Sequence, residues 1–255
     1  MYHQVCYRTS SSDNDVIHYE TGGVIVKVIG LLGGMSWQST LDYYRLVNEV
    51  VAAQLGGMHS AKVVLHSVDF DEIERCQSSG DWTTAGDILG RAAHGLELAG
   101  ADFLVICTNT MHKVADLIQA HTSIPILHIG DVTAQAIRTT GVDKVALLGT
   151  RYTLTQPFLK ARLADAHIKP LIPDDPGIEA INHIIFEELC RGEIRNESRI
   201  KIISIIDSLI EQGAEGVVLG CTELPLLIKP DHCSVPVFDT TTIHATAAAE
   251  LAMSR

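Results

Sequence analysis

Short apolar runs alternate along the chain with longer segments in which apolar residues recur every three or four positions. Residues 24–32 (VIVKVIGLL) form an apolar run typical of a buried strand, and residues 36–55 begin with Ser and then show helical periodicity. The same order continues with a strand over 61–69, a helix over 81–98, a strand over 102–108, a helix over 109–120 and a strand over 124–129. Strands that alternate with helices predict βαβ units and a parallel sheet.

The pattern then starts again, with recognisable sequence echoes of the first half. KVALLGT (144–150) echoes KVIGLLGG (27–34), and VPVFDTTT (235–242) echoes IPILHIGD (124–131). Between them, GAEGVVLGCTE (213–223) aligns without a gap on GADFLVICTNT (100–110). Three matching pairs in the same order indicate an internal duplication. We therefore expect an α/β protein of two pseudo-symmetric, doubly wound parallel-sheet domains, with the active site in the cleft between them.

The repeat also suggests where the domains divide. We expect residues 26–124 together with 236–255 to form the first domain, with the last helix packed back onto it, and residues 125–235 to form the second. Residues 1–25 are rich in Ser and Asp and lack a charged segment followed by an apolar core. We interpret them as a disordered N-terminal extension and not as a signal peptide.

The gap-free repeat makes a prediction about two neighbouring residues, Cys107 and Thr108. It places Thr108 opposite Cys221, and Cys107 opposite Gly220. Successive side chains of a strand point to opposite faces. If Cys221 faces the cleft, Thr108 should face it too, and Cys107 should point away as a small buried hydrophobic residue. A bulge that turned Cys107 toward the cleft remains the alternative.

Small polar residues follow the predicted strands at the edge where parallel α/β sheets bind ligands. Asn109, Thr110 and Thr222 could donate hydrogen bonds to a carboxylate there, beside unpaired backbone N–H groups. The turns after the first strand of each half carry three further candidate substrate-binding residues, Met35, Ser36 and Thr150. Helix capping alone is the alternative role for Ser36.

Composition excludes several functional classes. The chain has 255 residues and a net charge of −12, which argues against a nucleic-acid or anionic-membrane surface, and no apolar stretch reaches eighteen residues. Six scattered cysteines without a CxxC pair predict neither disulfides nor a metal site, and they favour a reduced, cytoplasmic setting. The sequence contains no GK dipeptide and no G-x-S-x-G, so a P-loop or a serine hydrolase is not expected.

The ordered set of motifs from Val26 to Met253 resembles the aspartate/glutamate racemase family of cofactor-independent racemases. The resemblance rests on IGLLGGMSW, CTNTMHKVAD, IPILHI, ALLGTRYT, IIFEELCRGEI, GCTELPLLI and VPVFDT. It implies a small amino-acid substrate, with aspartate and glutamate first, no cofactor such as pyridoxal phosphate, and a homodimer. In that family, two cysteines on opposite faces of the substrate Cα remove and return a proton.

The chain departs from this pattern at the first cysteine. The family motif is C-N-T, whereas this sequence reads Thr108-Asn109-Thr110. The resemblance and the repeat therefore both predict an unequal catalytic pair, Thr108 and Cys221. The second-motif cysteine acts on the L face in the family, so we expect L-substrate to react well and D-substrate slowly. Glu223 would activate Cys221 or favour the start of the following helix.

The partner of the substrate side chain stays open, with Arg151, Gln77 and Arg191 as candidates. HSVDF does not reproduce the family's basic loop motif, so a strict preference for acidic side chains does not follow. Two other classes also remain open. The scaffold could carry a single-cysteine isomerase or decarboxylase of diacids, or a small-ligand-binding protein that has lost its first cysteine.

Overall fold

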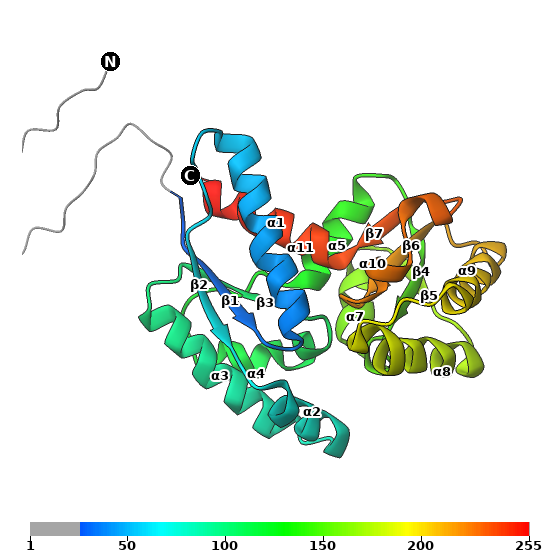
Figure 1. The fold of residues 1–255 in the computed structure, drawn as a ribbon, viewed down its shortest axis with the longest axis horizontal. Helices are drawn as coiled ribbons and strands as arrows, with labels where there is room; N and C mark the ends of the chain where they lie inside the picture. Colours follow the sequence, from blue (N-terminus) through cyan, green and yellow to red (C-terminus); the bar gives the residue numbers. More distant parts are fainter. Residues whose placement is uncertain (1–25, 255) are drawn as a thin grey trace, which may run out of the picture.

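The computed structural model describes residues 26–254, and the predicted extension over residues 1–25 lies outside the described residues. The described chain contains two parallel sheets (Figure 1). The first has the order β2-β1-β3, with β1 at Ile29–Gly33, β2 at Val63–Ser67 and β3 at Phe103–Ile106. The second has the order β5-β4-β6-β7, with β4 at Lys144–Gly149, β5 at Lys169–Leu171, β6 at Gly216–Gly220 and β7 at Val237–Asp239.

Helices connect the strands and cover the sheets. They are α1 Trp37–Leu55, α2 Phe70–Ser79, α3 Trp82–Leu98, α4 Ala115–Gln119, α5 Ile129–Arg138, α6 Arg151–Thr155, α7 Pro157–Asp165, α8 Asp175–His183, α9 Asn196–Glu211, α10 Leu224–Leu227 and α11 Thr240–Met253. Short 3₁₀ or π segments span Thr110–Val114, Ile184–Glu188, Leu189–Arg191 and Pro230–His232. The predicted α/β fold of two parallel-sheet halves is confirmed.

The two halves pair their central strands in the same register. Ile29 in β1 lies opposite Phe103 in β3, and Val145 in β4 lies opposite Gly216 in β6. On the sequence repeat, β1 maps onto β4 and β3 onto β6 with these same partners. Because of this shared register, residues that are equivalent in the alignment occupy equivalent places in the two halves.

The helices that follow the last strand of each half cross to the other half (Figure 1). In α11, the fully buried residues Ala245, Ala248, Ala249 and Ala252 share a core with β1 and α1. In α5, Ala134 and Ile137 join the core around β4 of the second sheet. The last helix therefore packs against the first half, where its alanine side chains permit close approach of α11 to α1.

Strand pairing differs from the expected division of the chain at two points. β7 hydrogen-bonds β6 in the second sheet, although residues 236–255 were expected in the first domain. The strand expected over 124–129 is reduced to one bridge between Ile126 and Leu104 in the first sheet, because α5 already begins at Ile129. The helix α2 was not expected from the sequence. The predicted domain boundaries themselves stay a prediction.

A cluster of buried rings joins α1, α11 and the segment before α5. The Tyr43 hydroxyl donates to His244 Nδ1 at 2.9 Å, because His244 Nε2–H donates to the Leu127 carbonyl at 2.7 Å. His112 Nε2 accepts the Ile129 N–H at 3.1 Å, so its Nδ1–H donates to the Thr108 carbonyl at 2.8 Å. Each of these two histidines is therefore satisfied in its neutral form.

Burial lowers the pKa of the clustered histidines. The pKa of His244 and that of His128 both fall to about 4, in each case mainly through burial. The pKa of His112 is also lowered well below the ordinary histidine value, by burial first and then by the two neighbouring imidazoles. Folded and unfolded chains therefore bind different numbers of protons in mildly acidic solution.

We expect the free energy of unfolding to fall as the pH drops below about 6.5, the ordinary histidine pKa, toward 4. In this window the histidines of the unfolded chain bind protons, whereas those of the folded cluster stay neutral. Each such histidine lowers the free energy of unfolding by up to roughly 1.4 kcal/mol per pH unit. Urea unfolding at pH 7.5, 6.0 and 5.0 measures this free energy of unfolding. His244→Gln should flatten the dependence, and exposed His59→Gln should not; an equal stability at pH 7.5 and 5.0 would contradict the cluster's role.

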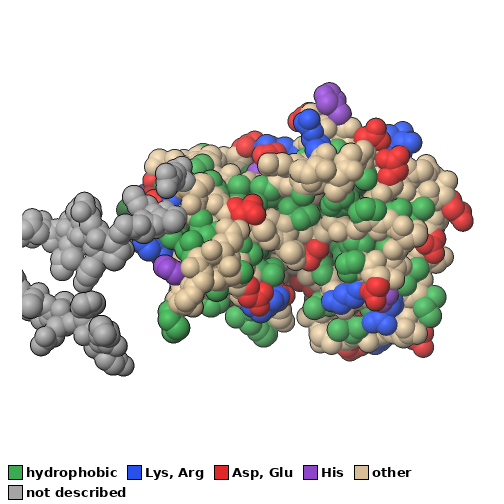
Figure 2. Space-filling view, turned by 90° about the horizontal axis from the view of Figure 1, so that it is seen from above, with side chains coloured by type: hydrophobic (Ala, Val, Ile, Leu, Met, Phe, Trp, Pro, Cys, Tyr) green, Lys and Arg blue, Asp and Glu red, His purple; other side chains and the backbone are tan. Residues whose placement is uncertain are grey.

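No described helix is both long and apolar enough to cross a membrane. On the face shown in Figure 2, Lys and Arg lie in small separate groups, several of them beside Asp or Glu. This face therefore offers no continuous basic surface of the kind that binds a phosphate backbone.

Candidate active site

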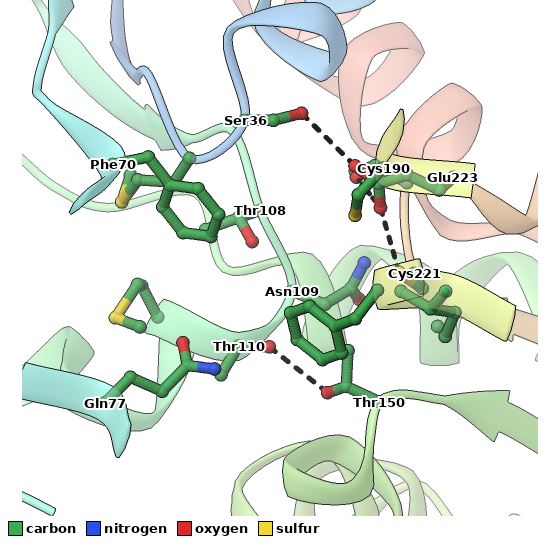
Figure 3. Close-up of a pocket in the computed structure, with 16 residues that line it drawn as sticks. Ser36, Phe70, Gln77, Thr108, Asn109, Thr110, Thr150, Cys190, Cys221 and Glu223 are labelled. Atoms are coloured by element: carbon green, nitrogen blue, oxygen red, sulfur yellow. Dashed lines mark hydrogen bonds between the residues drawn. The ribbon is translucent and has the colours of Figure 1, made fainter. Parts of the chain in front are cut away.

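A cavity lies between the halves, at the carboxyl ends of β1, β3, β4 and β6 (Figure 3). Its empty volume is about 500 Å³, part of which is open to solvent. It is lined by Met35, Ser36, Phe70, Gln77, Thr108, Asn109, Thr110, Met111, Thr150, Ile185, Phe186, Cys190, Gly220, Cys221, Thr222 and Glu223. All ten residues predicted for the site from the sequence are among them, and their individual roles stay predictions.

Thr108 faces the cavity and Cys107 does not. Cys107 is fully buried in the core shared by β1 and α11, with its thiol directed at the Val105 carbonyl 3.6 Å away. Its backbone N–H donates to the Leu32 carbonyl, which continues the β-ladder instead of forming the bulge considered above. Burial raises the pKa of the Cys107 thiol, so this cysteine is held as an inert neutral group.

Cys221 comes from the opposite half, at the end of β6. Its thiol donates to Glu223 Oε2 at 2.9 Å. Burial first, and then the negative charge of Glu223, raise the pKa of the Cys221 thiol, while a hydrogen bond from the Glu223 backbone N–H lowers it. Cys221 is therefore a protonated thiol at neutral pH, with a carboxylate in place to receive its proton.

The Glu223 carboxylate is held from three sides. Besides Cys221, the Thr222 hydroxyl donates to Oε2 at 2.8 Å, and the Ser36 hydroxyl donates to Oε1 at 3.2 Å. Ser36 belongs to the first half, so its bond to Glu223 crosses the cavity (Figure 3). Ser36 also caps α1 by accepting the Ser39 N–H at 3.4 Å, so helix capping is not its sole contact, and its role toward a substrate stays a prediction.

The opposite side of the cavity is built from uncharged donors. Asn109 Nδ2 donates to Thr240 Oγ1 at 3.0 Å, and the Thr240 hydroxyl in turn donates to the Leu219 carbonyl. The hydroxyls of Thr110 and Thr150 lie 3.4 Å apart and join the two halves (Figure 3). The Asn109 Oδ1 atom has no hydrogen-bond partner among the described residues, which leaves a buried acceptor at the site.

Two of the three residues considered as partners of the substrate side chain lie outside the cavity. Arg151 forms an ion pair with Glu179 and Arg191 one with Glu187, both largely exposed, and neither arginine lines the cavity. Their position after strands or turns suggested proximity, but each arginine pairs with a glutamate at the surface, Arg151 with one on α8 and Arg191 with one four residues earlier. Gln77 does line the cavity, from the last turn of α2.

Sequence reasoning missed six lining residues, Phe70, Met111, Ile185, Phe186, Cys190 and Gly220. Phe70 belongs to α2, whose polar sequence DEIERCQSS gave little helical signal. The motif IIFEELCRGEI contributes to the family resemblance, but nothing in its sequence indicates that Cys190 is directed toward Cys221 and Glu223 (Figure 3). Burial, and then Glu223, raise the pKa of Cys190 to about 12.

Comparisons with known proteins agree on one family. Residues 32–248 match the family described as Asp/Glu/Hydantoin racemase. The chain is 54% identical to a protein from Yersinia pestis described as a candidate Asp/Glu racemase, with a TM-score of 0.85, 89% of this chain and 100% of that chain covered. It is 38% identical to an aspartate racemase homologue from Pyrococcus horikoshii, with a TM-score of 0.79 and the same coverage of both chains.

A sequence relative is the broad specificity amino-acid racemase of Bacillus subtilis. It is 23% identical over 226 residues, which cover 84% of this chain and 92% of the relative. An aspartate racemase from Picrophilus torridus is 22% identical with a TM-score of 0.72, over 90% of this chain and 95% of that chain. At this identity the likeness shows a shared fold.

The burial of Cys107 predicts a difference in thiol reactivity. Cys107 should resist a maleimide reagent in the folded protein, whereas the partly exposed Cys76 should react, as followed by mass spectrometry of tryptic peptides. Cys107→Ala should cost about 1–2 kcal/mol in the free energy of unfolding, because it leaves a small void in the core. Labelling of Cys107 at the rate of Cys76 would place the thiol outside the core and refute the assignment.

Proposed function

We propose that this chain, which belongs to the Asp/Glu/Hydantoin racemase family, interconverts the enantiomers of small amino acids by removing the Cα proton on one face and returning a proton on the other. The chain is an enzyme of the racemase class, a kind of isomerase. The proposed reaction uses no cofactor and relies on Thr108 and Cys221. Aspartate and glutamate are the substrates that the family resemblance implies.

One observation carries the proposal. Thr108 and Cys221 occupy equivalent positions after β3 and β6 of the two halves, and both line the same cavity (Figure 3). Proton removal and return at one carbon require groups on opposite faces of that carbon. A substrate Cα held between Thr108 and Cys221 would meet this requirement.

The first step is the activation of Cys221. The thiol proton passes to Glu223 Oε2 along the existing hydrogen bond, and the Glu223 backbone N–H stabilises the thiolate that remains. The thiolate then removes the proton from the L face of Cα. The negative charge develops toward the substrate carboxylate, which backbone N–H groups and the Thr110 hydroxyl after β3 would hold.

The second step places a proton on the other face. The Thr108 hydroxyl gives its proton to the carbanion. Glu223 then releases to solvent the proton that it took from Cys221, and Thr108 recovers one from solvent, so that the enzyme returns to its starting state. The reverse direction is harder, because Thr108 would first have to lose its proton and no titratable side chain is hydrogen-bonded to its hydroxyl among the described residues. His112 bonds only the Thr108 backbone carbonyl, and it does so as a donor. We therefore expect slow exchange of D-substrate.

The equilibrium constant between the enantiomers is one, so the difference between Thr108 and Cys221 cannot appear in the final ratio of enantiomers. It should be visible instead in the rate of hydrogen exchange at Cα. Cys221 can return solvent deuterium to the same face that it deprotonated. L-substrate should therefore exchange Cα–H for deuterium faster than it racemises, while D-substrate exchanges slowly. The comparison separates the unequal pair from a pair of equal thiols.

We expect proton NMR in D₂O to show loss of Cα–H from L-aspartate or L-glutamate, followed separately from the D-enantiomers. Cys221→Ala should lower the L exchange by at least roughly 10²-fold, the usual contribution of a positioned base. Thr108→Ala should keep L exchange with retention and suppress formation of the D-enantiomer.

Cys107→Ala is the matched control, since it removes the neighbouring thiol without touching the cavity. L exchange that disappears in this folded variant would overturn the assignment of Thr108. If no amino acid exchanges its Cα proton at all, the racemase proposal fails, and maleate or a substituted malonate becomes the substrate to test.

Replacing Thr108 with Cys should restore a second thiol at the equivalent position. A thiol is far more acidic than an alcohol, so D-substrate should then exchange at least about tenfold faster than in the wild type. The same D₂O measurement on purified Thr108→Cys, with Thr108→Ser as the control that keeps a hydroxyl, tests this. Equal D exchange in the Cys and Ser variants would show that position 108 does not reach the D face.

The homodimer implied by the family resemblance and the cytoplasmic setting suggested by the cysteines stay predictions. Light scattering of the purified protein would determine the oligomeric state.

A further inference from the structure

We infer that His112 is a positioning residue for Thr108, because its imidazole holds the Thr108 backbone so that the hydroxyl faces the cavity and can give a proton to the substrate Cα. The inference rests on the proposed racemase reaction and adds a residue to it. His112 is buried and does not line the cavity, so it acts through Thr108 and does not touch the substrate.

Both backbone polar groups of Thr108 are held in place. Its N–H donates to the Ile106 carbonyl at 2.8 Å, and its carbonyl accepts the His112 Nδ1–H at 2.8 Å. The chain then enters the 3₁₀ segment Thr110–Val114. The two bonds fix the peptide planes on either side of Thr108, and these planes set the direction of its side chain.

The other ring nitrogen of His112 anchors the imidazole to the second half. His112 Nε2 accepts the N–H of Ile129 at 3.1 Å, and Ile129 is the first residue of α5, whose first-turn N–H groups have no partner within the helix. A backbone N–H can only donate, so the ring proton is held on Nδ1, where it serves Thr108. Because α5 packs into the core around β4, His112 connects Thr108 to the half that carries Cys221.

The second half supports its own residue in a different way. Continued by two residues, the sequence repeat places Pro225 opposite His112. The Cys221 carbonyl accepts the backbone N–H of Leu224 at 3.2 Å, where the Thr108 carbonyl accepts a side chain. The two halves therefore differ in the support behind the proposed proton donor as well as in the donor itself.

The contacts of His112 assign it an effect on geometry and not on proton transfer. Its two ring nitrogens bond a backbone carbonyl and a backbone N–H, and neither bonds the Thr108 hydroxyl. In the proposed reaction the carbanion receives its proton either from Thr108, with inversion, or from Cys221, with retention. Only inversion depends on the place of Thr108, so loss of His112 should lower inversion relative to retention.

Two substitutions separate the two ring contacts. His112→Gln keeps an acceptor near the Nε2 position for Ile129 and removes the donor to Thr108, whereas His112→Asn keeps a donor near the Nδ1 position and removes the acceptor. Each variant is incubated with L-aspartate or L-glutamate in D₂O. Chiral separation and mass spectrometry then give the amount of D-enantiomer formed and the amount of L-enantiomer that has gained deuterium at Cα.

The ratio of these two amounts at early times reports inversion against retention. His112→Gln should lower the ratio at least roughly tenfold, because a misplacement of about 1 Å at a reacting group can cost about 100-fold. His112→Asn should keep the ratio close to that of the wild type. Both products come from the same sample, so the ratio does not depend on how much of a variant is folded.

His244→Gln is the matched control, because it removes another buried histidine of the same ring cluster, one that bonds Tyr43 and Leu127 and not Thr108. It should lower the free energy of unfolding and leave the ratio unchanged. An unchanged ratio in His112→Gln, or an equal fall in all three variants or in both His112 variants, would overturn the inference and leave the racemase proposal standing. Absence of Cα exchange in the wild type would instead overturn the racemase proposal, and this inference with it.

Discussion

The active-site geometry depends on the shared register of the two sheets. Because β1 and β3 pair as β4 and β6 do, the chain leaves β3 and β6 at equivalent places and delivers Thr108 and Cys221 to one cavity. A slip of one residue in either ladder would exchange Thr108 for Cys107 and turn the hydroxyl into the core. The exchanged helices α5 and α11 then fix the halves together, since each packs into the core of the half that it does not follow.

A second constraint acts between Cys221 and Glu223. The carboxylate that stands ready to receive the thiol proton also repels the thiolate, and burial adds to that effect, so the resting thiol stays protonated. A protonated thiol reacts more slowly with oxidants and alkylating reagents than a thiolate does. The proposed base therefore has to be generated after the substrate arrives.

Much of this arrangement could be predicted from the sequence. The two-residue period of a strand and the gap-free repeat were sufficient to separate Thr108 from Cys107, because both are local properties.

Other features depend on contacts that no local pattern encodes. In α2 only Ile73 and Gln77 are buried, so its hydrophobic signal is weak. The segment 124–129 has the apolar composition of a strand, yet the start of α5 at Ile129 limits it to one bridge. For Arg191 the sequence does indicate the ion pair, because Glu187 lies four residues earlier on the same helical surface.

Substrate charge and base activation are linked in the proposed mechanism. The α-ammonium of a bound amino acid brings a positive charge into a cavity whose lining carries only the carboxylate of Glu223, while backbone N–H groups would hold the α-carboxylate. That charge offsets one of the causes that raise the pKa of Cys221, so binding itself moves the thiol toward the thiolate.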